Sequence, residues 1–368
     1  MSKYIKSFDN ASDMRTYLNT APGKRYYLLK NTSGTPGIGN VPESGKSIVS
    51  FYKPHYDYLT FTAQQANSWV RFNNSGWSSA EYSTDGGTTW TNAMGVQVNL
   101  SNVGDSVKYR GVITSGNTNM KFYMSGKIAA SGSIMSMYNN NPDGDVISIT
   151  NCFYYMFRGC TSLTQAPELP ATTLANACYA YMFYGCSSLT EAPELPATTL
   201  ANTCYGYMFE SCTSLTQAPE LPATTLANNC YQNMFYTCSS LTTVPELPAT
   251  TLASECYSGM FARCILLTSA YIPDVNSIEQ NSMNSMFQYC SSLTSAEIAI
   301  SKNMGNIANW IFSGCTNLNY VKLHTSYWDN SDWLGNAAPT GIVECPTGCN
   351  IRLNSSSGVP TGWTKVEY

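Results

Sequence analysis

The chain has 368 residues, of which 43% are apolar and 12% aromatic, and this composition excludes an intrinsically disordered chain. No apolar run reaches the length of about 18 residues that a transmembrane helix needs, so membrane insertion is not expected. Lys and Arg number 19 against 23 Asp and Glu, giving a net charge of -4. Such a chain lacks the basic surface that binds a phosphate backbone, and nucleic acid is not expected as a partner.

Charged residues make up only 11% of the chain, less than half of the roughly 25% that is usual in globular proteins. Its surface must therefore be built mainly from Ser, Thr, Asn, Gly and Tyr. A surface of this kind is typical of extracellular, fibre-like or virion proteins and unusual in cytosolic enzymes.

Residues 1–48 are interpreted as an N-terminal attachment segment. The opening MSKYIKSFDN is followed by neither an apolar stretch of about seven residues nor a small-residue cleavage site, so export by a Sec-type signal is not expected. The stretch Gly39–Ser47, GNVPESGKS, approaches a phosphate-binding loop. Asn40 stands where that loop needs glycine, and SIVSFYK after it reads as a strand instead of the required helix. Nucleotide binding is therefore not expected.

Residues 49–140 alternate apolar and polar side chains in short runs such as YLTFTA, WVRFNN and VKYRGVI, with turn signals between them. This pattern predicts a small, mainly β domain in the form of a sandwich. The motif S-x-D-x-G-x-T-W resembles the Asp-box hairpin of sialidases and other β-proteins. We interpret it as structural, because a sialidase would carry several copies and an arginine cluster. Its residues are Ser83, Asp85, Gly87, Thr89 and Trp90.

From Cys152 the sequence nearly copies itself every 26 residues, as in CYAYMFYGCSSLTEAPELPATTLANT at 178–203. A fixed period of this length predicts a solenoid, because one unit buries its apolar face only when neighbours stack on it. Leu174, Cys178 and Met182 recur at i, i+4 and i+8 and predict one stripe of a short helix, while the prolines of EAPELP favour an extended strand. For residues 141–323 we predict an α/β solenoid of about seven coils, with short parallel strands plus short helices, and for residues 324–368 a C-terminal cap.

The repeated pattern M-F-x-x-C-x-S-L-T, as in Met182, Phe183 and Cys186, resembles that of the BspA-like leucine-rich repeat proteins of bacterial surfaces. The resemblance covers about half of the chain and implies a leucine-rich-repeat solenoid with a role in adhesion and host interaction. Two features depart from the family. The first four units have Glu where it usually has an aliphatic residue eight positions after the Cys, and these proteins are normally secreted, whereas no signal is visible here.

The opening KYIKSF at Lys3–Phe8 and the ending GVPTGWT at residues 358–364 also bear on the setting. Together with a β-domain and these repeats, they resemble virion proteins of phages infecting gut Bacteroidales. This resemblance implies a virion protein whose N-terminal segment binds other virion proteins.

The 14 cysteines follow the repeat. Pairing along a ladder would draw alternate coils together, so buried free thiols are expected, which suits assembly in a reducing cytoplasm. A zinc site is not expected, because ligands arranged in lines do not converge on a metal. Cys345 and Cys349 are expected as a reduced pair, with a small disulfide as the alternative. One ladder comprises Cys160, Cys186, Cys212, Cys238, Cys264, Cys290 and Cys315, and the other Cys152, Cys178, Cys204, Cys230 and Cys256.

Four glutamates, Glu168, Glu194, Glu220 and Glu246, occupy the same repeat position. Acid/base catalysis needs two carboxyl groups whose environments separate their pKa values, and carboxyls in nearly identical repeats should behave alike. We expect a solvated acidic stripe, with a bound cation as an open alternative. No enzyme activity, cofactor or metal site is predicted.

The repeat positions that vary are those expected to face outward, and many of them are tyrosines. Exposed Tyr with few charges suits stacking on sugar rings or on a protein partner, and a solvated face without a ligand is the alternative. The candidate partner-binding residues are Tyr154, Tyr155, Arg158, Tyr181, Tyr184, Tyr207 and Tyr236.

These observations favour a non-enzymatic phage virion structural protein, of the fibre or capsid-decoration type, assembled in the host cytoplasm. Its repeats would adhere to a glycan or protein of a bacterial surface. The alternative is a cell-surface adhesin of a Bacteroidales-type bacterium. A homo-oligomer is left open.

Overall fold

The chain divides into two units, Met1–Tyr56 and Asp57–Tyr368, of which the second is the one described below. The predicted attachment segment at residues 1–48 lies outside the described residues. A computed structural model describes residues 56–73, 79–116, 120–301, 308–326, 328, 333–351 and 359–368.

The N-terminal part of the second unit consists of strands in two sheets, which confirms the mainly β character that the alternating pattern predicts. A six-stranded sheet has the order β4-β3-β6-β1-β8-β9 and a three-stranded sheet the order β5-β2-β7. Phe61, Phe72 and Phe122 are fully buried, and Phe122 lies 4.8 Å from each of the other two rings. The elements are β1 (Leu59–Ala63), β2 (Ser68–Asn73), β3 (Ser79–Ser83), β4 (Thr91–Asn92), β5 (Gln97–Leu100), β6 (Ser106–Val112), β7 (Lys121–Ser125), β8 (Ile128–Ser131), α2 (Ser136–Asn139) and β9 (Leu163–Gln165).

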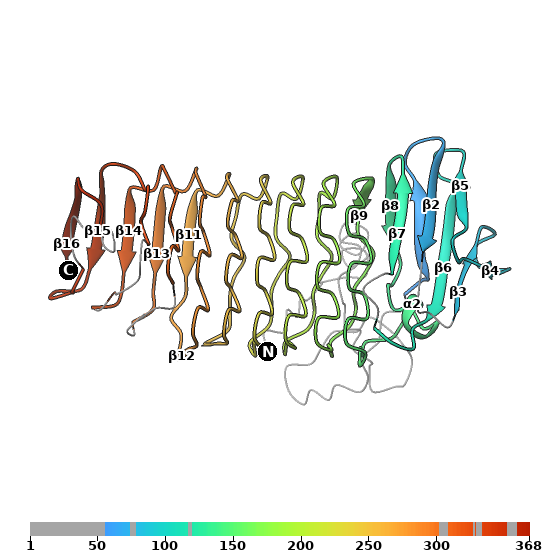
Figure 1. Cartoon of the computed structure of the whole chain (residues 1–368), viewed down its shortest axis with the longest axis horizontal. Helices are drawn as coiled ribbons and strands as arrows, with labels where there is room; N and C mark the ends of the chain where they lie inside the picture. The colour runs from blue at the N-terminus through green and yellow to red at the C-terminus, as the bar shows by residue number, and fades with distance from the viewer. Residues whose placement is uncertain are drawn as a thin grey trace, which may run out of the picture. The chain divides into compact units, whose positions relative to one another are not determined.

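These sheets cover the first coil of the repeats. β8 pairs in parallel with β9, which already belongs to the repeated sequence (Figure 1). The N–H of Phe122 in β7 donates to the carbonyl of Met156 at 2.8 Å, and the Cys160 thiol donates to the carbonyl of Phe122 at 3.1 Å. An exposed strand edge at the start of a solenoid invites association, and the N-terminal sheets occupy this edge.

The later repeats form a five-stranded parallel sheet of order β11-β13-β14-β15-β16. Ile272, Ile298 and Leu323 are in register across it and buried, which matches the aliphatic position of these copies. The segment expected to be a cap adds β15 and β16 to this sheet. The elements are β10 (Thr251–Leu252), β11 (Ser269–Ile272), β12 (Ser277–Ile278), β13 (Ser295–Ile298), β14 (Tyr320–Leu323), β15 (Gly341–Cys345) and β16 (Trp363–Glu367).

The expectation of a short helix in each repeat is wrong, because the described residues of 141–323 contain no helix. The segment is a run of turns in which every fourth residue is left-handed, with φ of 50° at Ala177, 55° at Tyr181 and 71° at Gly185. The N–H of Met182 closes a turn on the carbonyl of Tyr179, whereas the N–H of Tyr179 donates to Cys204 of the next coil at 3.0 Å. Half of the backbone groups thus bond between coils, which a helix would not allow.

Stacked phenylalanine rings fill the centre of the repeats. Neighbouring centroids lie 5.3 to 5.8 Å apart along the column, which extends back to Phe122 of β7 at 5.4 Å. Each step adds one ring per coil, so the column runs the length of the repeats. The rings are Phe157, Phe183, Phe209, Phe235, Phe261, Phe287 and Phe312.

The larger cysteine ladder bonds to this column. The Cys186 thiol donates to the carbonyl of Phe157 in the preceding coil at 3.1 Å, and the same bond recurs at every rung from Cys160 to Cys315. Twelve cysteines are free and buried, which confirms the expectation for both ladders. The expectation for the last pair is wrong, since Cys345 and Cys349 form a disulfide: the turn at Gly348 brings their Cα atoms to 6.3 Å.

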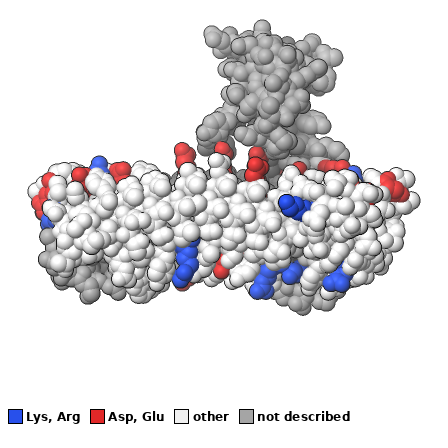
Figure 2. Space-filling view, turned by 90° about the horizontal axis from the view of Figure 1, so that it is seen from above, with Lys and Arg blue, Asp and Glu red and all other residues white. Residues whose placement is uncertain are grey.

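The described surface carries few charges. Figure 2 shows most Asp and Glu along one long edge of the view, with some Lys and Arg near them, and a further row of Lys and Arg along the opposite edge. No helix among the described residues is long and apolar enough to cross a membrane.

The twelve free thiols should resist alkylation in the native protein. Burial raises the pKa of Cys160 and of Cys315 to about 12, so these thiols stay protonated at pH values near 8, and the thiolate is the reactive form. Intact mass spectrometry after iodoacetamide treatment should show no adduct on the folded chain and twelve adducts in denaturant without reductant. Native labelling of a ladder cysteine would contradict this packing.

Candidate functional site

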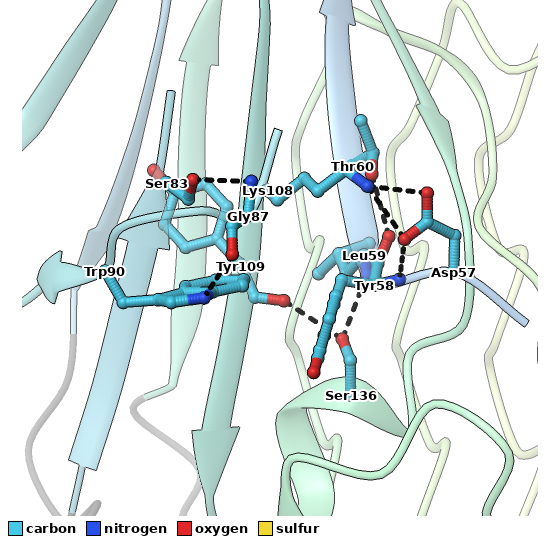
Figure 3. A network of polar contacts seen from close by, with 10 residues as sticks. All are labelled: Asp57, Tyr58, Leu59, Thr60, Ser83, Gly87, Trp90, Lys108, Tyr109 and Ser136. Atoms are coloured by element: carbon cyan, nitrogen blue, oxygen red, sulfur yellow. Dashed lines mark hydrogen bonds and ion pairs between the residues drawn. The ribbon is translucent and has the colours of Figure 1, made fainter. Parts of the chain in front are cut away.

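The Asp-box motif forms a closed set of local hydrogen bonds. The Ser83 hydroxyl accepts from the N–H of Gly87 at 2.8 Å and donates to Asp85 at 2.7 Å. The carboxylate of Asp85 accepts from the Thr89 hydroxyl at 2.6 Å and from the Thr89 N–H at 2.9 Å, and these bonds hold its pKa well below the usual value. The indole of Trp90 donates to the carbonyl of Gly87 at 3.0 Å (Figure 3).

The surroundings of the Asp-box are equally self-contained. The Trp90 ring lies 5.1 Å from the Tyr58 ring and 4.2 Å from the Arg110 guanidinium. Lys108 pairs with Asp57 at 2.6 Å in the same network (Figure 3). The polar groups of the Asp-box and its surroundings form hydrogen bonds and ion pairs within the hairpin and the adjacent strands. This geometry supports a role of the motif in stabilising the turn.

Six of the seven candidate partner-binding residues gather on the turn side of the first three coils. We call them the first tyrosine cluster. The Tyr155 and Tyr181 rings lie 5.1 Å apart, and Tyr181 stacks on Tyr207 at 4.4 Å with an angle of 5°. The guanidinium of Arg158 lies 4.5 Å from the Tyr155 ring and 5.2 Å from the Tyr184 ring. The members are Tyr154, Tyr155, Arg158, Tyr181, Tyr184 and Tyr207; Arg158 is exposed and the tyrosines are partly exposed.

The backbone conformation sets the spacing of the tyrosine rings in this cluster. Tyr155, Tyr181 and Tyr207 all occupy left-handed positions, with φ of 64°, 55° and 58°. Such a conformation is uncommon for a residue with a bulky side chain, and it persists here because the flanking peptide groups bond to the neighbouring coils. The rings therefore repeat at the spacing of the coils.

Tyr236 belongs to a second group, which sequence reasoning missed. Its hydroxyl accepts from Nε of Arg263 at 3.0 Å, and the guanidinium of Arg263 lies 4.6 Å from the ring of Tyr289, which is 43% exposed. We call Tyr236, Arg263 and Tyr289 the second tyrosine cluster. The sequence contains a signal for this cluster, because Arg263 and Tyr289 stand at the same repeat position in successive coils.

Cations also lie over aromatic rings in the three-stranded sheet. Arg71 of β2 is 5.1 Å from the ring of Tyr123 in β7 and 5.9 Å from that of Trp69, and Lys121 is 4.9 Å from Tyr123. Sequence reasoning placed outward residues only in the repeats, so it missed this group. The sheet and the first coil are joined through Phe122.

Glu210 is the acidic residue beside the first cluster. Partial burial raises its pKa from 4.5 to about 7, although the nearby charge of Arg158 acts in the opposite direction. Near neutral pH its carboxyl is therefore divided between the neutral and the charged form.

The four repeated glutamates do not behave alike, so that expectation is wrong. Glu168 is half-buried, one of its carboxylate oxygens has no hydrogen-bond partner, and burial raises its pKa. Its N–H donates to the carbonyl of Gly132, so contact with the N-terminal sheets separates it from the exposed Glu194, Glu220 and Glu246. No group of three or more His, Cys, Asp or Glu side chains in the described residues is placed to hold a metal ion.

Comparison with known proteins gives two matches. A sequence model of the BspA type leucine-rich repeat region matches this chain in six copies, over residues 150–294 and 282–332. Among solved structures, a leucine-rich repeat protein from Bacteroides ovatus ATCC 8483 is similar, with 15% identity and a TM-score of 0.21 over 57% of this chain and 80% of that one. No curated protein matches.

We expect Glu210 to make folding stability depend on pH. Its folded-state pKa of about 7 exceeds the value of 4.5 in the unfolded chain, so the folded state binds more protons between them. The free energy of unfolding should therefore fall as pH rises through this window, and Glu210→Gln should lessen that fall, leaving the part that the raised pKa of Glu168 contributes. Thermal unfolding of both variants across the window checks this. The exposed Glu220→Gln serves as the control, and loss of the same slope in it would show that burial is not the cause.

Proposed function

Because residues 150–332 belong to the BspA-type leucine-rich repeat family, we propose that the chain is a non-enzymatic adhesion protein acting at a bacterial surface. The observation that carries the proposal is the first tyrosine cluster, a partly exposed aromatic surface with a single arginine on a scaffold of few charges. Tyrosine rings present an apolar face and a polar tip, which suits contact with sugars or with a protein.

A non-enzymatic role is supported by the state of the nucleophiles and carboxylates. The cysteines are the most distinctive nucleophilic residues in the repeats, but the twelve outside the disulfide are buried. Burial keeps their pKa high, so they hold no thiolate for catalysis. Asp85 is engaged by its own hairpin.

We further propose that the adhesion module is part of a phage virion, attached to other virion proteins through residues 1–48. The resemblance of the opening and the ending of the chain supports this, and so do the buried free thiols, which suit assembly in a reducing cytoplasm. The second candidate is a cell-surface adhesin of a Bacteroidales-type bacterium. The disulfide between Cys345 and Cys349 favours it, since disulfides persist in oxidising surroundings.

Binding of the fluorescently labelled full chain to gut Bacteroidales cells, with and without their capsular polysaccharide, tests the adhesion role. The full chain is needed because β7 and β8 cover the first coil. We expect capsule-dependent binding that falls about tenfold in the Tyr181→Ala/Tyr207→Ala variant, because the stacked pair is lost. Tyr271→Ala in β11, whose ring is 54% exposed, is the control and should bind like the wild type. Failure to bind any strain would contradict adhesion.

Deleting residues 1–48 tests the virion assignment. The truncated chain should keep the melting temperature of the full chain, because the unit from Asp57 has its own core, yet be absent from purified phage particles. Western blotting of gradient-purified particles provides the measurement. Incorporation that survives the deletion would contradict the role of this segment, and display on the bacterial outer surface would favour the cellular adhesin.

A further inference from the structure

Most of the described cations that lack an acidic partner lie on one face. Four Lys and Arg residues of the described part are ion-paired, namely Lys108, Arg110, Lys322 and Lys365. Five have no carboxylate within ion-pair distance among the described residues: Arg71, Lys121, Lys127, Arg158 and Arg263. Of these five, all except Lys127 lie over a tyrosine ring.

The four cations over tyrosine rings belong to a continuous hydrogen-bonded surface. β2 pairs with β7, and β7 bonds to the first coil through Phe122. The space that a Cβ at Gly159 would fill lies 3.9 Å from Nζ of Lys121. Because Gly159 follows Arg158 directly in the chain, Lys121 lies beside Arg158. Arg263 is the equivalent of Gly159 in the coil that lies four coils further along the solenoid. An unbroken series of hydrogen bonds between successive coils links these two positions.

We call this row of Arg71, Lys121, Arg158 and Arg263, with their tyrosines, the basic tyrosine stripe. Six steps of about 4.8 Å separate its ends, so it extends roughly 29 Å. The tyrosine faces hold the guanidinium planes and lower the entropy cost of engaging a ligand. Within the described ranges no carboxylate lies at ion-pair distance from these cations, and Glu210, the acid within the stripe, is partly protonated near neutral pH.

From this arrangement we propose that the basic tyrosine stripe binds an acidic polysaccharide along its length, an inference that rests on the adhesion role proposed above. The arginine guanidinium groups pair with carboxylate or sulfate groups through charge-assisted hydrogen bonds. The intervening tyrosine rings stack on the apolar faces of the sugars. A periodic ligand fits because the tyrosine rings that follow Arg158, namely Tyr181 and Tyr207, recur once per coil.

A nucleic acid fits the stripe less well. Four cations over roughly 29 Å give about one charge per 7 Å, a density far below that of a phosphate backbone. The chain as a whole carries a net charge of -4, which opposes association with a dense polyanion. A polymer with one acidic group every sugar or two comes closer to this average charge density.

The test measures binding of the full chain by biolayer interferometry to two matched pairs of polymers. One pair is polygalacturonate and its carboxyl-reduced form, and the other is dextran sulfate and dextran. We expect the acidic member to bind about tenfold more tightly in at least one pair, and added salt to weaken that binding. The double variant Arg158→Gln/Arg263→Gln should reduce binding to the level of the neutral polymer. Lys127→Gln, which removes an unpaired cation outside the stripe, should bind like the wild type.

The outcomes separate this inference from the adhesion role. Equal binding to both members of each pair, or a double variant that binds like the wild type, would overturn the acidic ligand while capsule-dependent adhesion could stand. Tighter binding to single-stranded oligo(dT) than to either acidic polymer would replace the ligand class by nucleic acid. If the double variant also loses adhesion to capsulated cells while keeping the wild-type melting temperature, the stripe is the adhesive surface.

Discussion

Hydrogen bonds between the backbones of successive coils are the interaction on which the rest of the described unit depends. They require alternate peptide groups to point along the axis, and the chain meets this requirement by placing every fourth residue of the turn segment in the left-handed region, as at Ala177, Tyr181 and Gly185. The conformation is costly for residues other than Gly and Asn. It persists because each coil is held by the coils on both sides, so the stability of the repeats is collective.

The buried columns follow from the same geometry. Coils stacked in register bring identical side chains into line, so Phe183 lies between Phe157 and Phe209 with nearly parallel rings. The Cys186 thiol then gives the Phe157 carbonyl a second hydrogen-bond donor beside the N–H of Cys160. The cysteines are therefore polar links within an apolar core. Their regular spacing reflects this bond, and neither redox chemistry nor metal binding is needed to explain it.

The stacking also determines the functional surface. Residues that vary between repeats are brought to a common face, and small sequence differences there create the two tyrosine clusters with their arginines. The N-terminal sheets join this face through Phe122, which adds Arg71 and Lys121 to a row that begins outside the repeats. Elsewhere in the described part the cations have acidic partners, apart from Lys127, so the stripe is where positive charge remains available.

The sequence by itself determined the repeat, its period, its inward residues and the free thiols, because burial at a fixed period is visible in one dimension. It did not distinguish helix from turns: a turn segment with a left-handed residue every fourth position places i, i+4 and i+8 on one side, as a helix does. Gly and Asn at those positions, such as Gly159 and Asn233, were the available signal. Only the tertiary structure joined β8 to β9, separated Glu168 from its equivalents and aligned Arg71 with Arg263, because these relations depend on how distant segments stack.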